Sequence, residues 1–118
     1  MTIRTGLHSR GFRYRLHSKH LPGSPDLVLR KFDAVIFING CFWHRHRCDM
    51  FRWPKSNREF WRNKLEGNAR RDKRNIDALR DSGWRVYVVW ECSLRGPNRE
   101  TEDDVILKIE KWLVSGVR

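Results

Sequence analysis

The sequence predicts an α/β domain in which helices flank a mixed central sheet. Residues 34–38 and 84–90 are runs of apolar, β-branched or aromatic side chains, as is typical of buried strands. Elsewhere apolar residues recur every three or four positions, the period of a helix that packs on a sheet. Strands that alternate with helices indicate this fold class. A chain of 118 residues is long enough for one domain with a real core, and we expect that domain to span residues 1–118.

The N-terminal part should contain a short helix and two strands. Residues 3–9 are consistent with the last turns of a helix that Gly11 closes. Residues 12–17 alternate large apolar with basic side chains, as in a half-exposed strand. A turn rich in proline and glycine at 21–25 precedes a second strand over 26–29.

The next elements are a tight connection at 32–33, the strand 34–38 and a long helix. Ser56 and Glu59 form a capping box, with Ser56 as the N-cap, and Gly83 ends the helix. One face of this helix carries Trp61, Leu65, Ala69, Asp72, Ile76 and Leu79. A buried charge is costly unless it is paired, so Asp72 on this face needs a specific partner, either in a structural ion pair or in a functional site.

The C-terminal part is a strand followed by a helix. Glu91 and Cys92 lie where the strand 84–90 ends, and α/β folds often place site residues at such ends. Thr101 should cap a final helix with an acidic first turn. Its packing face consists of Ile106, Ile109, Trp112 and Leu113.

The composition favours an anionic partner. Lysine and arginine number 25 against 14 acidic residues, which gives a formal charge of +11. Such a surplus favours nucleic acid or an acidic membrane, although a merely basic surface is the simpler alternative. No stretch has the length of a transmembrane helix or the pattern of a signal peptide. The 3 cysteines fit metal ligands in a reducing compartment better than disulfides, so we expect a cytoplasmic protein without membrane contact.

Residues 41–48 hold two thiols, two imidazoles, two large aromatic rings and two guanidinium groups. Thiolates and imidazoles suit zinc, aromatic faces can stack on bases, and arginines bind phosphates. A closed set of four protein ligands would be a structural zinc site. His44 is a rival to His46 in such a set, and incidental thiols and imidazoles are the remaining alternative. The set that uses every cysteine is Cys41, His46, Cys48 and Cys92.

This set leaves His44 for chemistry, near Asp26 if their strands are neighbours. Mg²⁺ readily takes a carboxylate and waters as ligands. A nearby imidazole could accept a proton from an attacking water. These are the parts of metal-assisted phosphodiester hydrolysis, although an aspartate after proline is also a common turn or cap residue.

Several motifs occur in an order that resembles the very short patch repair (Vsr) DNA mismatch endonucleases. The resemblance runs from about Arg10 to Gly96. The motifs are LPGSPD at 21–26, VIF at 35–37, GCFWH at 40–44, EFW at 59–61, Asn68, Arg71-Asp72, GWRV at 83–86 and VWEC at 89–92.

This resemblance implies a fold related to the type II restriction endonucleases, of the PD-(D/E)XK type, with a structural Zn²⁺. It implies an enzyme that uses Mg²⁺ to nick one strand beside the thymine of a T:G mismatch in double-stranded DNA. Other mismatch-repair proteins are possible partners. A single nick needs only one active site, so we expect a monomer.

By position, the resemblance implies that Asp26 and the main-chain carbonyl of Ile38 hold Mg²⁺, with His44 as the general base. It assigns the zinc to the four ligands named above. Apolar insertion costs least at a step that a mispair has weakened, so aromatic residues of the family form a wedge there. Core packing is the alternative for Trp61, and Asn68 is a further candidate for DNA binding or for the water shell of the metal. The wedge residues would be Phe42, Trp43 and Trp61.

Two departures from the family pattern stand out. A family glutamate that orders the waters of the metal would fall just before Met1, so we expect a chain without the family's N-terminal segment. Asn39 replaces a histidine, which removes the expected partner of the catalytic candidate Asp72. Two alternatives therefore stay open: a related restriction or homing-type endonuclease, and a zinc-stabilised DNA-binding module with weak or no cleavage.

Overall fold

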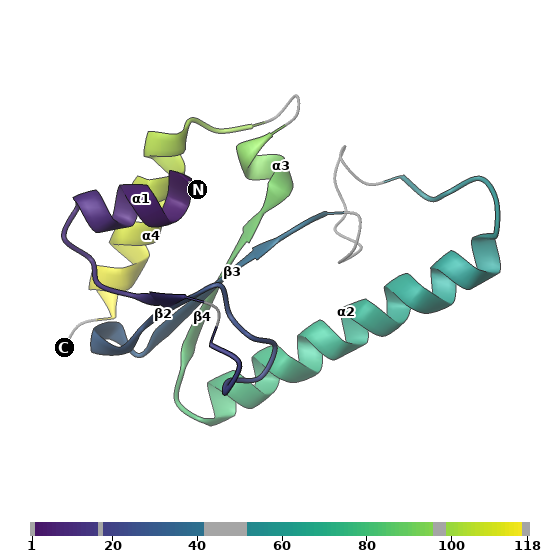
Figure 1. Cartoon of the computed structure of the whole chain (residues 1–118), viewed down its shortest axis with the longest axis horizontal. Coiled ribbons are helices and arrows are strands. Elements are labelled where there is room, and N and C mark those ends of the chain that lie inside the picture. The colour runs from purple at the N-terminus through teal and green to yellow at the C-terminus, as the bar shows by residue number, and fades with distance from the viewer. Residues whose placement is uncertain (1, 17, 42–51, 96–98, 117–118) are drawn as a thin grey trace.

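The computed structural model describes residues 2–16, 18–41, 52–95 and 99–116. A four-stranded sheet lies at the centre. Figure 1 shows α1 and α4 on one side of the sheet and the long helix α2 on the other. The predicted α/β class with a mixed sheet is therefore confirmed. No helix in the described part of the chain is long and apolar enough to cross a membrane.

The sheet has the strand order β1-β2-β3-β4. Strand β2 pairs antiparallel with both β1 and β3, whereas β3 and β4 are parallel. Helix α2 lies between β3 and β4 in the sequence and forms the crossover that a parallel pair requires. The strands are β1 (Arg15–Leu16), β2 (Leu27–Leu29), β3 (Ala34–Asn39) and β4 (Arg85–Trp90).

The turn between β2 and β3 is tight, as predicted. A short 3-10 helix, η1 (Arg30–Phe32), is closed by Asp33 in the left-handed conformation, with φ 49°. The predicted strand over 12–17 is confirmed only at Arg15–Leu16. Phe12 instead turns into the core and packs against Phe32, with the ring centroids 5.5 Å apart.

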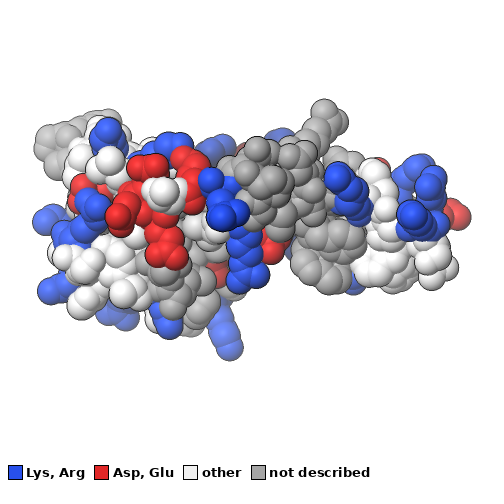
Figure 2. Space-filling model, turned by 90° about the horizontal axis from the view of Figure 1, so that it is seen from above, with Lys and Arg blue, Asp and Glu red and all other residues white. Residues whose placement is uncertain are grey.

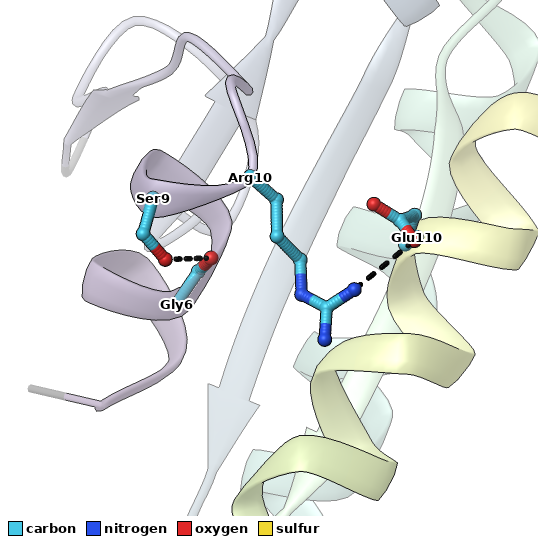
Figure 3. Close-up of polar contacts among 4 residues, drawn as sticks. All are labelled: Gly6, Ser9, Arg10 and Glu110. Atoms are coloured by element: carbon cyan, nitrogen blue, oxygen red, sulfur yellow. Dashed lines mark hydrogen bonds and ion pairs between the residues drawn. The ribbon is translucent and has the colours of Figure 1, made fainter.

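One face of the sheet packs on α1 (Thr2–Ser9) and α4 (Glu102–Ser115). Gly6 lets these helices approach closely, because a Cβ atom there would lie 2.1 Å from Cδ1 of Ile106. At the rim, Arg10 forms an ion pair with Glu110 at 3.2 Å (Figure 3). The buried side chains of this face include Ile3, Leu7, Leu27, Leu29, Ala34, Ile36, Ile109 and Leu113.

The final helix begins and packs as the sequence predicts. The side chain of Thr101 accepts a hydrogen bond from the Asp104 N–H at 3.1 Å and so caps the helix. The Arg85 guanidinium lies 4.3 Å from the ring centroid of Trp112 and donates to the Leu113 carbonyl at 3.1 Å. Tyr87 also packs on Trp112, and partial burial raises the pKa of its hydroxyl above the ordinary value of 10.0. These contacts join α4 to β4.

The opposite face of the sheet packs on α2 (Arg58–Asp81). Leu79 is fully buried against β2 and β3, and the partly buried Ile76 packs on the same cluster. The helix ends before Gly83, whose φ of 93° suits the predicted stop. The N-terminal half of α2 extends past the sheet (Figure 1).

The predicted capping box at the start of this helix is wrong. The N-cap is Asn57, in the left-handed conformation with φ 53°, and its side chain forms no capping hydrogen bond. The left-handed residue turns the chain between Ser56 and the first helical residue, Arg58. Ser56 therefore lies one residue before the N-cap, whereas a capping box requires the serine to be the N-cap itself.

Candidate active site

A pocket of about 450 Å³ lies between the end of β3, the turn before β2 and the middle of α2. It brings together four positions that the sequence singled out, namely Asp26, Ile38, Asn39 and Asp72. Its other lining residues are Gly23, Ser24, Phe37, Arg71, Asn75 and Ile76. The pocket is therefore built at the carboxyl end of one of the two parallel strands, where α/β folds commonly place their sites.

Asp26 is held by the backbone of the neighbouring strand. Its Oδ2 accepts a hydrogen bond from the Ile38 N–H at 2.6 Å, and the side chain is partly buried. A carboxylate has two oxygens and several acceptor positions, so this bond leaves capacity for a further ligand. Asp26 is thus fixed in direction at the wall of the pocket.

The main-chain carbonyl of Ile38 is the second oxygen that the sequence singled out. The ladder between β2 and β3 ends at the pair of Leu27 and Ile36, so Ile38 lies beyond it, and its N–H donates to the Asp26 side chain. Ile38 lines the pocket near the end of β3, as Asp26 does from the turn before β2. The strand end and this hydrogen bond thus place Ile38 at the wall of the pocket.

Asp72 reaches the pocket from α2. The polar residues of this helix that line the pocket, Arg71, Asp72 and Asn75, occupy one stripe with Ile76. Asp72 is partly buried at the wall of the pocket, which accounts for a carboxylate on a face that otherwise packs on the sheet. The carboxylates of Asp26 and Asp72 and the carbonyl of Ile38 are hard oxygen donors, a set that fits a divalent cation such as Mg²⁺.

Three polar residues of the pocket had received no role from the sequence. Arg71 and Ser24 belong to matched motifs but carried no assignment, and Asn75 was not considered. The helical spacing gave a usable signal, because Asn75 follows Asp72 by three positions and so shares its face. Ser24 has φ 48° in a turn that approaches α2 closely. Only the folded chain shows that this turn forms the opposite wall.

Two of the four expected zinc ligands come from neighbouring strand ends. Asn39 pairs with Trp90 at the end of β4, and Cys41 and Cys92 each follow their residue of this pair by two positions. Cys41 is fully buried, and its N–H donates to the Glu91 carboxylate at 3.4 Å. Cys92 is partly buried in α3 (Glu91–Leu94). Two thiols in this arrangement fit half of a tetrahedral zinc site.

The structure does not describe the other two expected zinc ligands. His44, His46 and Cys48, together with Phe42 and Trp43, lie outside the described residues. Within the described ranges, no group of three or more His, Cys, Asp or Glu side chains could hold a metal ion. The zinc set therefore stays a prediction.

The remaining predicted DNA-binding residues lie along α2. Trp61 is partly buried near its N-terminus and makes an edge-to-face contact with Phe60, with the ring centroids 5.2 Å apart. Phe60 itself is 58% exposed, which is high for a large apolar side chain. Asn68 accepts a hydrogen bond from Arg71 at 3.4 Å, two turns further along the helix than Trp61.

Known proteins are similar to most of this chain. Residues 1–50 match the family described as DNA mismatch endonuclease Vsr. The DNA mismatch endonuclease Vsr of Escherichia coli is 42% identical over 107 residues, which cover 91% of this chain and 69% of that protein. The chain belongs to the Vsr family of DNA mismatch endonucleases.

Other Vsr relatives are described as nicking enzymes. The type II nicking enzyme V.XorIIP of Xanthomonas oryzae is 50% identical over 78% of this chain and 68% of its own length. V.NmeAIP of Neisseria meningitidis is 46% identical over 79% of this chain and 66% of its own length. The chain thus spans about two thirds of each of these relatives.

Proposed function

We propose that this chain is a Mg²⁺-dependent endonuclease that acts on double-stranded DNA with a T:G mismatch and nicks one strand next to the thymine, as a step of very short patch repair. The observation that carries the proposal is the pocket that joins Asp26, Ile38 and Asp72. Membership of a family of DNA mismatch endonucleases, with type II nicking enzymes among the relatives, supports it.

In this proposal different residues of the chain bind the metal, contact its waters and accept the proton. Asp26 and the Ile38 carbonyl would hold the Mg²⁺, while Asp72 on the facing helix would accept hydrogen bonds from its waters. When bound, the cation stabilises charge on the phosphoryl oxygens and lowers the pKa of a bound water. His44 would take the proton of the attacking water as the general base. The hydrogen bond from the Ile38 N–H keeps Asp26 in place during this step.

A structural Zn²⁺ would fix the loop that carries His44. In this proposal Cys41, His46, Cys48 and Cys92 bind the zinc. Its support is that Cys41 and Cys92 follow the paired ends of β3 and β4. Phe42, Trp43 and Trp61 would form the aromatic wedge at the mismatch. Holding the loop by metal would bring the base and the wedge to the DNA together.

A nicking assay tests the proposed function. Wild type should nick a T:G duplex in Mg²⁺ but not in EDTA, and should cut the matched T:A duplex much more slowly. Asp26→Asn removes a negatively charged oxygen donor and should abolish nicking. His44→Ala should slow it by roughly 10²–10⁴-fold, as expected for the loss of a general base.

A matched control removes one carboxylate away from the pocket. Asp81 is exposed at the end of α2, so Asp81→Asn should nick at the wild-type rate. Equal cutting by Asp26→Asn and wild type would refute the metal site. Cleavage that ignores the mismatch would favour a restriction or homing-type enzyme, and specific binding without any nicking would favour a DNA-binding module.

A further inference from the structure

The pocket contains a cation that the proposed reaction does not yet use. Among the described residues, Arg71 is the only positively charged side chain that lines the pocket. It lies on α2 next to Asp72, and its side chain is exposed. A cation at this wall can therefore meet an anionic ligand that enters the pocket.

The present contact of Arg71 is weak. One of its terminal nitrogens donates to the amide oxygen of Asn68 at 3.4 Å, which is long for a hydrogen bond. The partner is neutral, and the bond uses one of the five N–H donors that a guanidinium carries. An anion that binds to Arg71 would thus have only this long hydrogen bond to displace within the described part of the chain.

The charge balance of the pocket indicates which anion. Asp26, Asp72 and a phosphodiester each carry one negative charge, and a divalent cation neutralises two of the three. One positive charge is still needed to admit the substrate to a partly desolvated pocket. Arg71 supplies it, and its planar fork matches the two non-bridging oxygens of a phosphate.

We propose that Arg71 binds a non-bridging oxygen of the scissile phosphodiester from the α2 wall of the pocket. This inference rests on the proposed function, because it takes the same pocket as the site of cleavage. Arg71 then acts on the transition state as well as on the substrate, since charge on the phosphoryl oxygens must be stabilised as the bond breaks.

A binding experiment isolates this contact without cleavage. Affinity is measured in EDTA for two T:G duplexes, one of which carries a neutral methylphosphonate at the phosphodiester next to the mismatched thymine. For each protein, the affinity for the unmodified duplex is divided by the affinity for the methylphosphonate duplex. This ratio should be roughly 10-fold larger for wild type than for Arg71→Gln, which is the value of one charge-assisted hydrogen bond. Arg80→Gln removes the same charge from an exposed position at the end of α2 and should show the wild-type ratio.

The kinetic readout is single-turnover nicking in Mg²⁺. Arg71→Gln should be slower by roughly 10- to 100-fold, whereas Arg71→Lys should recover part of the rate because it keeps the charge but not the fork. Identical methylphosphonate ratios for Arg71→Gln and wild type, with wild-type nicking intact, would overturn the Arg71 inference alone. Absence of nicking by wild type on every duplex would instead overturn the proposed function.

Discussion

Single residues in this pocket serve the fold as well as the proposed chemistry. Asp26 accepts the Ile38 N–H at 2.6 Å, beyond the last pair of the β2–β3 ladder, and so satisfies a backbone group of β3. Removing the carboxylate would therefore alter both stability and cleavage. Two variants can separate these contributions, because an asparagine side chain keeps an acceptor oxygen and an alanine does not.

We expect Asp26→Ala to lower the free energy of unfolding by about 1–3 kcal/mol, since it leaves a partly buried N–H without its acceptor. Asp26→Asn should lower it much less, although both variants lose nicking. Urea denaturation of wild type and both variants measures this difference. Asp81→Asn, at an exposed position, should stay within about 0.5 kcal/mol of wild type. Equal stability of the alanine and asparagine variants would mean that the hydrogen bond contributes nothing.

The sequence could predict a site residue where its side chain carries the signal. Asp26 follows a proline at the start of a strand, and Asp72 interrupts an apolar stripe, and both line the pocket. Arg71 received no role because basic residues are frequent throughout the helix, and only the folded chain shows which of them reaches the pocket. The Ile38 carbonyl is a backbone group, so no property of the isoleucine side chain could reveal it; the family resemblance alone pointed there.

At the scale of elements, two parallel strands position both proposed metal sites. Ile38 lies near the end of β3 and lines the pocket. Cys41 follows the end of β3, as Cys92 follows the end of the neighbouring strand β4. The strands themselves could be predicted, because β-branched and aromatic residues are enriched in strands. Their parallel pairing and register depend on the crossover through α2 and could not be read locally. The predicted capping box was wrong because the left-handed Asn57, and not Ser56, is the N-cap of α2.

Zinc should accordingly act as a link between the end of β3 and the start of α3. We expect one zinc ion per purified chain by elemental analysis, and a lower melting temperature after treatment with a strong chelator. Cys92→Ser should lose the metal and melt at a lower temperature, because a structural site needs all four ligands. His20→Gln changes an exposed histidine outside the proposed set and should retain zinc. Folded wild-type protein without stoichiometric zinc would exclude the four-ligand site.

At the scale of the whole molecule, the charge of +11 is unevenly distributed. The first turn of α4 holds Glu102, Asp103 and Asp104, and Figure 2 shows acidic side chains gathered over the half of the molecule that contains this helix. Helix α2 has 24 residues and extends past the sheet (Figure 1). Many of its exposed positions are basic. The chain therefore offers an elongated basic element beside its pocket, as binding to a DNA backbone requires.

This distribution predicts a strong dependence of DNA affinity on salt. Counterion release makes the binding constant fall steeply with salt, by roughly 10³-fold between 50 and 200 mM if about six phosphates are contacted. Fluorescence anisotropy over this range measures the slope. Matched and mismatched duplexes should give similar slopes, because the phosphate term does not depend on sequence. An affinity that stays constant over this range would argue against contacts to the phosphate backbone.

The proposed active site should tolerate change at one of its ligands. The oxygen that would bind the cation at position 38 belongs to the backbone, and the N–H of the same residue is held by the Asp26 carboxylate. Many side chains could replace isoleucine at 38 and leave that oxygen where it is. Variation at position 38 together with constraint at Asp26 would then be the mark that this site leaves on related sequences.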